Sequence, residues 1–179
     1  NIGGVVVSNA TLHNKDEIER KDIRIGDTAC IQRAGDVIPQ VLKVIKKAKK
    51  RKDLIKLPSH CPSCNSETIK EKDEAVIRCT NSINCDAQIV GALIHFVSKK
   101  SLNIEGLGEK QILQFYNLDY IKNFEDIFYI ERYKKKILKL DGWGELSFNN
   151  LIKSINISKK IELDKFIFSL GIRYVGETL

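Results

Sequence analysis

The hydrophobic positions in the first fifty residues come in short runs that are rich in β-branched side chains. Residues 4–8 (GVVVS), 28–32 (TACIQ) and 36–45 (DVIPQVLKVI) each predict a β-strand. The polar segment between the first two runs predicts one turn of helix or a surface loop, and Gly26–Asp27 predicts a tight turn. Short strands that leave no room for helical crossovers favour a small OB-type β-barrel over residues 1–56.

After about residue 90 the hydrophobic positions recur every three or four residues. This period appears in residues 87–99 (AQIVGALIHFVSK), 109–118 (EKQILQFYNL) and 147–155 (SFNNLIKSI), and it predicts amphipathic helices. We therefore expect an all-α domain over residues 91–179. The chain as a whole is predicted to be a multidomain α+β protein.

Four of the five cysteines follow the spacing C-x2-C-x14-C-x5-C. They are Cys61, Cys64, Cys79 and Cys85. Two pairs on short turns supply what a tetrahedral Zn²⁺ ion requires. The alternative is a set of disulfides or inert thiols, but an odd number of cysteines argues against a closed disulfide framework. Since four thiolates fill the coordination shell, we expect a structural zinc finger over residues 57–90.

The net charge of +7 favours polyanionic partners, and it is unevenly distributed. Residues 1–60 carry +6, residues 61–94 carry −2 and residues 95–179 carry +3, so the finger is expected to act as a spacer. The basic run 46–52 (KKAKKRK) is interpreted as a solvated linker, with phosphate contact as the alternative. No apolar stretch reaches the roughly 18 residues of a membrane span.

The helical half contains an internal repeat. Residues 102–112 (LNIEGLGEKQI) recur as 138–148 (LKLDGWGELSF), and 170–179 (LGIRYVGETL) form a looser third copy. A Gly-hydrophobic-Gly turn between two helices exposes N–H groups that suit a phosphate. We predict that these backbone amides bind a nucleic acid strand without base specificity, and the alternative is a helical hairpin without a ligand. The glycines concerned are Gly106, Gly108, Gly142, Gly144 and Gly176.

Two nucleotide-binding alternatives conflict with the context of these glycines. A dinucleotide-binding turn requires a preceding strand and a third glycine, and both are missing here. Lys139–Gly142 (KLDG) matches the K-x-D-G pattern of covalent nucleotidyl transferases. This match lies within the second copy of the repeat, so we interpret it as accidental and not as a nucleotidyl-transfer site.

Together these segments resemble the bacterial NAD⁺-dependent DNA ligases. "GGVVVSNATLHN" and "DIRIGDTACIQRAGDVIPQV" resemble the OB-fold domain of that family, and "CPSC…CTNSINCDAQ" resembles its four-cysteine zinc finger. "HFVSKKSLNIEGLGEKQI", "LDGWGELSFNNL" and "LGIRYVGE" resemble the first three of its helix-hairpin-helix motifs. The resemblance covers essentially the whole chain.

The resemblance implies a reaction whose chemistry lies outside this chain. Such an enzyme is adenylated on a lysine by NAD⁺, transfers AMP to the 5′-phosphate of a nick and seals the nick with the 3′-hydroxyl. The lysine and its adenylation domain are expected upstream of residue 1, together with the first OB strand. A fourth hairpin and a BRCT domain are expected after Leu179. NAD⁺ and Mg²⁺ would be bound mainly in those other parts, so we expect no catalytic residue here.

The resemblance also implies DNA contacts. Arg33 would contact the DNA backbone near the nick, Val37 and Ile38 would press into the minor groove, and Lys110 would meet a phosphate. The expected partner is nicked double-stranded DNA, encircled without sequence preference by a monomeric enzyme. The expected location is the bacterial cytoplasm, on the nucleoid.

Two rival functions remain open at this point. One is a non-catalytic OB and helix-hairpin-helix module of a repair or recombination protein, which a four-cysteine finger between the two parts disfavours. The other is a metal-stabilised scaffold for protein interactions, which predicts no DNA affinity.

Overall fold

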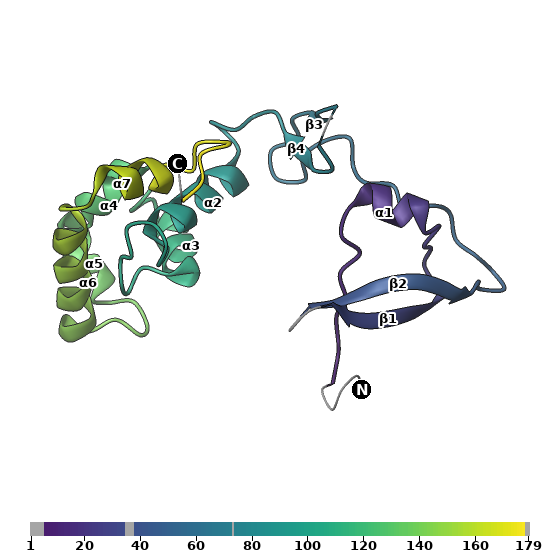
Figure 1. Ribbon diagram of the computed structural model, residues 1–179. Coiled ribbons are helices and arrows are strands. Elements are labelled where there is room, and N and C mark those ends of the chain that lie inside the picture. The colour runs from purple at the N-terminus through teal and green to yellow at the C-terminus, as the bar shows by residue number, and fades with distance from the viewer. Residues whose placement is uncertain (1–5, 35–37, 73, 178–179) are drawn as a thin grey trace. The chain divides into compact units, whose positions relative to one another are not determined.

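The computed structural model describes residues 6–34, 38–72 and 74–177. The chain forms two compact units, residues 1–80 and 81–179 (Figure 1). The division falls inside the predicted finger. The three predicted domain ranges therefore stay predictions.

The first unit begins with a short helix and an antiparallel pair of strands, α1 (Lys15–Arg20), β1 (Thr28–Ala34) and β2 (Ile38–Lys46) (Figure 1). The side chain of Asn14 caps α1 by accepting a hydrogen bond of 2.9 Å from the amide of Glu17. Helix and sheet share a small buried core. Its members are Ile18, Ile23 and Val41.

The strand predicted over residues 4–8 is wrong for Val6–Ser8, which have no regular structure. Val6 is 79% exposed, so its β-branched side chain has no apolar surface to pack on. Pairing starts later, where Thr11 forms a single parallel bridge with Gln40. Among the described residues this sheet has two strands, and the closed barrel stays a prediction.

A second antiparallel pair follows in the same unit, β3 (Thr68–Lys70) and β4 (Ile77–Cys79). Each strand has three residues, too few to bury a core of their own. This pair carries the cysteine-containing turns.

The described part of the second unit consists of helices and turns (Figure 1). Its helices are α2 (Asp86–Val97), α3 (Glu109–Asn117), α4 (Phe124–Phe128), the 3₁₀-helix η1 (Ile130–Tyr133), α5 (Lys134–Ile137), α6 (Glu145–Ser158) and α7 (Leu163–Ser169). The three long helices predicted from the hydrophobic period are confirmed as α2, α3 and α6. Within the part of the chain described, no helix has the length and apolar character needed to cross a membrane.

One hydrophobic core holds these helices together. Phe96 of α2, Phe115 of α3 and Phe148 of α6 are each at most 1% exposed. Phe96 stacks on Phe124 with ring centroids 4.4 Å apart, and Phe115 packs against Trp143 at 5.3 Å. The core therefore fixes the turns between the helices as well as the helices themselves.

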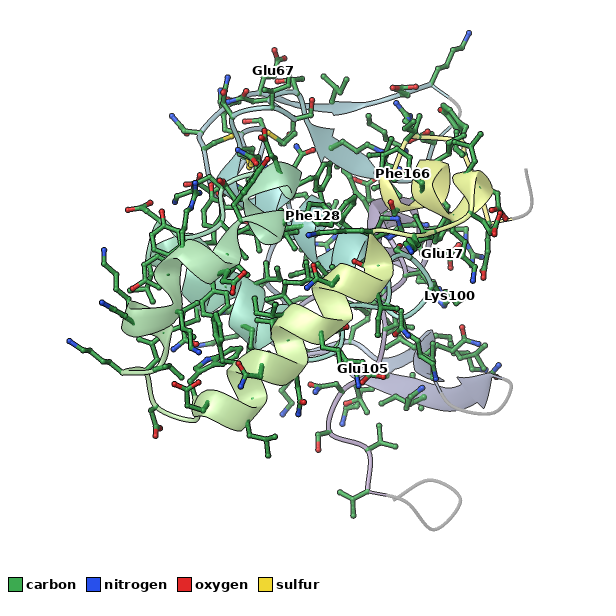
Figure 2. All side chains as sticks on the ribbon, turned by 90° about the vertical axis from the view of Figure 1, so that its left-hand side faces the viewer. Glu17, Glu67, Lys100, Glu105, Phe128 and Phe166 are labelled. Atoms are coloured by element: carbon green, nitrogen blue, oxygen red, sulfur yellow. The ribbon has the colours of Figure 1, made fainter. Side chains whose placement is uncertain are left out.

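Helix α7 is attached to this core through α2. The ring Nε2 of His95 lies 2.9 Å from the carbonyl oxygen of Phe168, and the two rings meet edge to face at 5.0 Å. Phe166 of α7 and Phe128 of α4 border one surface groove (Figure 2). His95 is half-buried and links two helices.

Candidate functional site

The four cysteines predicted as zinc ligands lie together. Their Sγ atoms are all within 4.8 Å of one another, and those of Cys64 and Cys79 are 3.4 Å apart. Cys61 and Cys85 are buried, Cys85 completely. Among the described residues, neither His60 nor Cys30 belongs to this group.

Local backbone structure positions each cysteine pair. Asn65, just after Cys64, has a left-handed φ of 57°, and its amide donates to the carbonyl of Cys61 at 2.8 Å. Cys79 ends β4, and Cys85 is the N-cap of α2. Asparagine tolerates the left-handed conformation, which is why C-P-S-C-N forms a compact turn.

This arrangement suits a tetrahedral Zn²⁺ ion. An ion bound at about 2.3 Å separates its sulfur ligands by roughly 3.8 Å, close to the spacing of these atoms. Four thiolates leave no coordination position for water or a substrate. The ion therefore supplies folding stability rather than Lewis-acid chemistry.

The Gly-hydrophobic-Gly turns share one backbone geometry. Gly106 has a φ of +85° and Gly142 has a φ of +76°, and glycine adopts this left-handed conformation without steric cost. The next residue closes the turn in each copy, since the amide of Leu107 donates to Ile104 at 3.3 Å and that of Trp143 donates to Leu140 at 3.2 Å. Lys139–Gly142 thus leads into a helix-connecting turn, as its place in the repeat predicts.

The third copy forms the same turn. The amide of Val175 donates to the carbonyl of Ile172 at 3.0 Å, matching the two earlier turns. Gly176 corresponds to Gly108, whereas Tyr174 takes the place of Gly106 with a φ of +66°. The left-handed conformation costs a residue with a Cβ atom roughly 1–2 kcal/mol.

The first turn borders an open groove of about 640 Å³. Its lining comprises Asn103, Glu105, Gly106, Ser147, Asn150, Lys153, Ser154 and Ile157. The amide of Glu105 donates to Ser154 Oγ at 2.7 Å, which joins the turn to α6. The groove brings together neutral polar side chains, the carboxylate of Glu105 and the ammonium group of Lys153 beside the backbone of Gly106.

The backbone amides just before α3 and α6 differ in whether they already donate a hydrogen bond. The amide of Gly144 donates to Ser147 Oγ at 2.9 Å, so it already has an acceptor from its own helix. Within the described residues, the amide of Gly108 donates no hydrogen bond. Lys110 is exposed on the first turn of α3. The amide of Gly108 is therefore available to an acceptor, whereas the amide of Gly144 already donates to Ser147.

Two family models match this chain. One, described as the NAD-dependent DNA ligase OB-fold domain, matches residues 1–53. The other, described as the NAD-dependent DNA ligase C4 zinc finger domain, matches residues 60–87. The first match agrees with the OB-type domain predicted from the β-prone runs, and the second agrees with the cysteine cluster described above.

Curated relatives are similar over nearly the whole chain. The DNA ligase of Gluconobacter oxydans is 49% identical over 177 residues, covering 99% of this chain and 26% of that protein. Those of Acidiphilium cryptum and Xanthobacter autotrophicus are 47% and 48% identical over 178 and 188 residues, with the same coverage. The chain belongs to the NAD-dependent DNA ligase family. It spans about a quarter of the length of the ligases it matches.

The match to the ligase zinc finger and the clustered thiolates both indicate that the metal is zinc. The C4 finger match includes all four cysteines, and the structure brings their sulfur atoms together. Structural zinc, predicted from the cysteine spacing, is confirmed.

The DNA contacts that the ligase resemblance implies in the OB domain are only partly described. Val37 lies outside the described residues. Arg33 pairs with Pro39 across the β1–β2 sheet, and Ile38, the first residue of β2, is 64% exposed. An exposed apolar side chain at a strand end is available to a partner. The roles of these residues stay predictions.

One feature of this ligase-family chain was missed by sequence reasoning. Arg51, inside the basic run, reaches back to the segment before β1, where its Nη1 lies 2.5 Å from Asp22 Oδ2. Its Nη2 lies 2.9 Å from Asp27 Oδ2, and the side chain of Asp27 is 1% exposed. The hydrogen bond from Arg51 lowers the pKa of Asp27 to about 2.

This ion-paired cluster corrects the interpretation of residues 46–52 as a solvated linker at Arg51 and Ala48, whereas the lysines of the run are exposed. Lys47 also pairs with Asp22, at 3.3 Å, and the amide of Ala48 donates to Asp27 at 3.0 Å. Composition could not reveal this, because the partners lie more than twenty residues earlier in the sequence. The only hint was an aspartate placed directly after the turn glycine Gly26.

Proposed function

We propose that this chain is the DNA-binding portion of an NAD⁺-dependent DNA ligase. It holds nicked duplex DNA while an adenylation domain elsewhere in the protein joins the 5′-phosphate to the 3′-hydroxyl. The observation that carries the proposal is the turn geometry, which occurs three times in one helical unit of a ligase-family chain. NAD⁺ and Mg²⁺ act mainly outside this chain.

The three turns are proposed to be helix-hairpin-helix motifs. Support comes from the left-handed φ at the same turn position in each copy and from the two helix starts that follow at Glu109 and Glu145. Helix N-termini and turn amides attract phosphate oxygens and carry no base information, so binding is independent of sequence. Repetition would place several phosphates of one duplex in register.

Side chains around the first turn extend this phosphate site. Lys153 and Asn150 line its groove from α6, and Lys110 is exposed on the first turn of α3, two residues after Gly108. Lysine supplies charge and asparagine supplies an amide donor, and both kinds of group contact the DNA backbone in protein–DNA complexes. Gly106 and Gly108 contribute backbone amides, as Gly142 and Gly176 do in the other copies.

The OB domain is proposed to contribute further contacts to the bound DNA. It would close as a barrel, with Arg33 on the DNA backbone and with Val37 and Ile38 in the minor groove. The exposed side chain of Ile38 supports this role. The protein would act as a monomer that encircles DNA in the bacterial cytoplasm.

The direct test is sealing in trans. The 179-residue chain is mixed with the separately expressed adenylation domain of a family ligase, and joining of a nicked duplex is measured with NAD⁺. Sealing that depends on both parts and is lost with Arg33→Ala supports the proposal. Tight duplex binding without sealing would leave a DNA clamp that needs a further strand or linker for joining, and absence of duplex binding would overturn the proposal.

Salt dependence tests the phosphate site on its own. Lys153→Gln should lower the slope of log Kd against log salt by about one, because each phosphate contact releases about one counterion. Lys72→Gln, an exposed lysine of the finger, is the matched control and should leave the slope unchanged. Equal slopes for both variants would contradict a phosphate contact at the first turn.

A further inference from the structure

The third turn departs from the first two at the position where they need glycine. Tyr174 adopts a φ of +66° there, and its side chain is 76% exposed. A bulky residue in the left-handed region is strained, and burial of the ring does not offset that strain. Strained residues persist where the surroundings dictate the backbone, and they often mark functional positions.

The residues on both sides of Tyr174 contact other parts of the helical unit. Gly171, just before the turn, packs so closely on α2 that a Cβ atom there would lie 3.3 Å from Cδ2 of His95. On the other side of the turn, Glu177 pairs with Lys100 at 3.1 Å. The turn therefore contacts α2 on one side and, through an exposed ion pair, Lys100 on the other.

The residue before Tyr174 reverses the charge found in the other copies. Glu105 and Asp141 precede Gly106 and Gly142, whereas Arg173 precedes Tyr174. The guanidinium carbon of Arg173 lies 4.8 Å from the centroid of the Tyr174 ring, a cation–π distance. At the third turn, Arg173 and Tyr174 thus place an exposed cation and a phenol hydroxyl at the two positions where the first two turns have a carboxylate and a glycine.

We propose that Arg173 and Tyr174 form a side-chain phosphate site on the third turn. The Tyr174 hydroxyl donates a hydrogen bond to a backbone phosphate of the duplex, and the Arg173 guanidinium provides its counter-charge. The pair adds to the backbone amides used at the first two turns. This inference rests on the proposed function, because it assumes that the three turns face one duplex.

The experiment measures the binding of a fluorescent nicked duplex to the 179-residue chain over a range of salt concentrations. Arg173→Gln should weaken binding about tenfold and lower the salt slope by about one. Tyr174→Phe should weaken binding by a few fold without changing the slope, because it removes a neutral donor. Lys165→Gln, an exposed lysine of α7, is the matched control and should behave like the original chain.

Tyr174→Gly separates a functional role from a structural one. Glycine accepts the left-handed conformation, so this variant should melt no lower than the original chain and still lose the affinity that Tyr174→Phe loses. Unchanged affinity in Tyr174→Phe and Arg173→Gln, with Lys153→Gln still weakened, would overturn this inference and leave the proposed function standing. Absence of duplex binding by the original chain would overturn both.

Discussion

The guanidinium of Arg51 lies 2.9 Å from the carboxylate of Asp27, and the side chain of Asp27 is 1% exposed. The two residues are 24 positions apart, one after a turn glycine and the other near the end of a basic run. A carboxylate withdrawn from water needs such a partner, because an unpaired charge in that position is unfavourable. The pair therefore connects the turn before β1 to the basic run that follows β2.

Removing the cation of this pair should destabilise the first unit. Arg51→Met leaves the carboxylate of Asp27 without its charged partner, so we expect a melting temperature lower by several degrees, measured by circular dichroism. Lys50→Met changes an exposed lysine in the same basic run and should have no such effect. Equal melting temperatures for the two variants would show that the pair does not support the fold.

The same pair predicts a dependence of stability on pH. The pKa of Asp27 is lowered from 3.8 to about 2 in the folded chain. Its stabilising contribution is therefore complete above pH 3.8 and is lost as the pH falls through about 2. Melting temperatures followed across this interval should fall more steeply for the original chain than for Arg51→Met. Parallel curves would exclude Asp27 as the titrating group.

Removal of the metal should unfold the finger. Structural zinc is coupled to folding, so a strong chelator should abolish the ordered structure between Cys61 and Cys85, as seen by hydrogen exchange. Cys64→Ser should release the ion, whereas Cys30→Ser should retain one zinc per chain, measured by elemental analysis. A chelated chain whose amides in this segment stay protected would contradict the structural role.

Two glycines should respond to alanine in opposite ways. Gly106→Ala places a Cβ atom on a residue with a φ of +85°, which should cost about 1 kcal/mol of stability. Gly91 lies inside α2 with open space around it, so Gly91→Ala should stabilise the helix by roughly 0.5–1 kcal/mol. Chemical denaturation measures both effects, and a stabilising Gly106→Ala would show that the turn differs from the one described.

The hydroxyl of Tyr116 donates to Asp86 at 2.6 Å and joins α3 to the start of α2. This hydrogen bond raises the pKa of Tyr116 to about 12, from 10.0. The bond stabilises the fold fully below pH 10.0, and that contribution is lost as the pH rises through about 12.

Tyr116→Phe should therefore lower stability by about 1 kcal/mol at neutral pH. It should also remove one late step from the ultraviolet titration of the tyrosines. Tyr129→Phe, in which the ring is 56% exposed, should change neither property. A late ionisation that survives in Tyr116→Phe would assign the raised pKa to another tyrosine.

Much of the helical unit could be predicted from local sequence. The three- and four-residue period gave α2, α3 and α6, because a helix that buries one face must repeat its apolar positions at that interval. The left-handed turns at Gly106 and Gly142 followed from the absence of a Cβ atom. The same reasoning failed at residues 6–8, because a β-prone segment becomes a strand only where a partner is available to pair with it.

The sequence by itself determined the four zinc ligands, the helical repeat and the ligase family, since each depends on residue type at a fixed spacing. Only the tertiary structure decided that Arg51 pairs with Asp27, that Ser147 accepts from the amide of Gly144 and that Tyr174 adopts the left-handed φ of a turn glycine. These depend on packing, which brings side chains together or imposes a backbone conformation that their own spacing does not specify. Local sequence determines which conformation a segment prefers, and the tertiary fold determines which side chains come into contact.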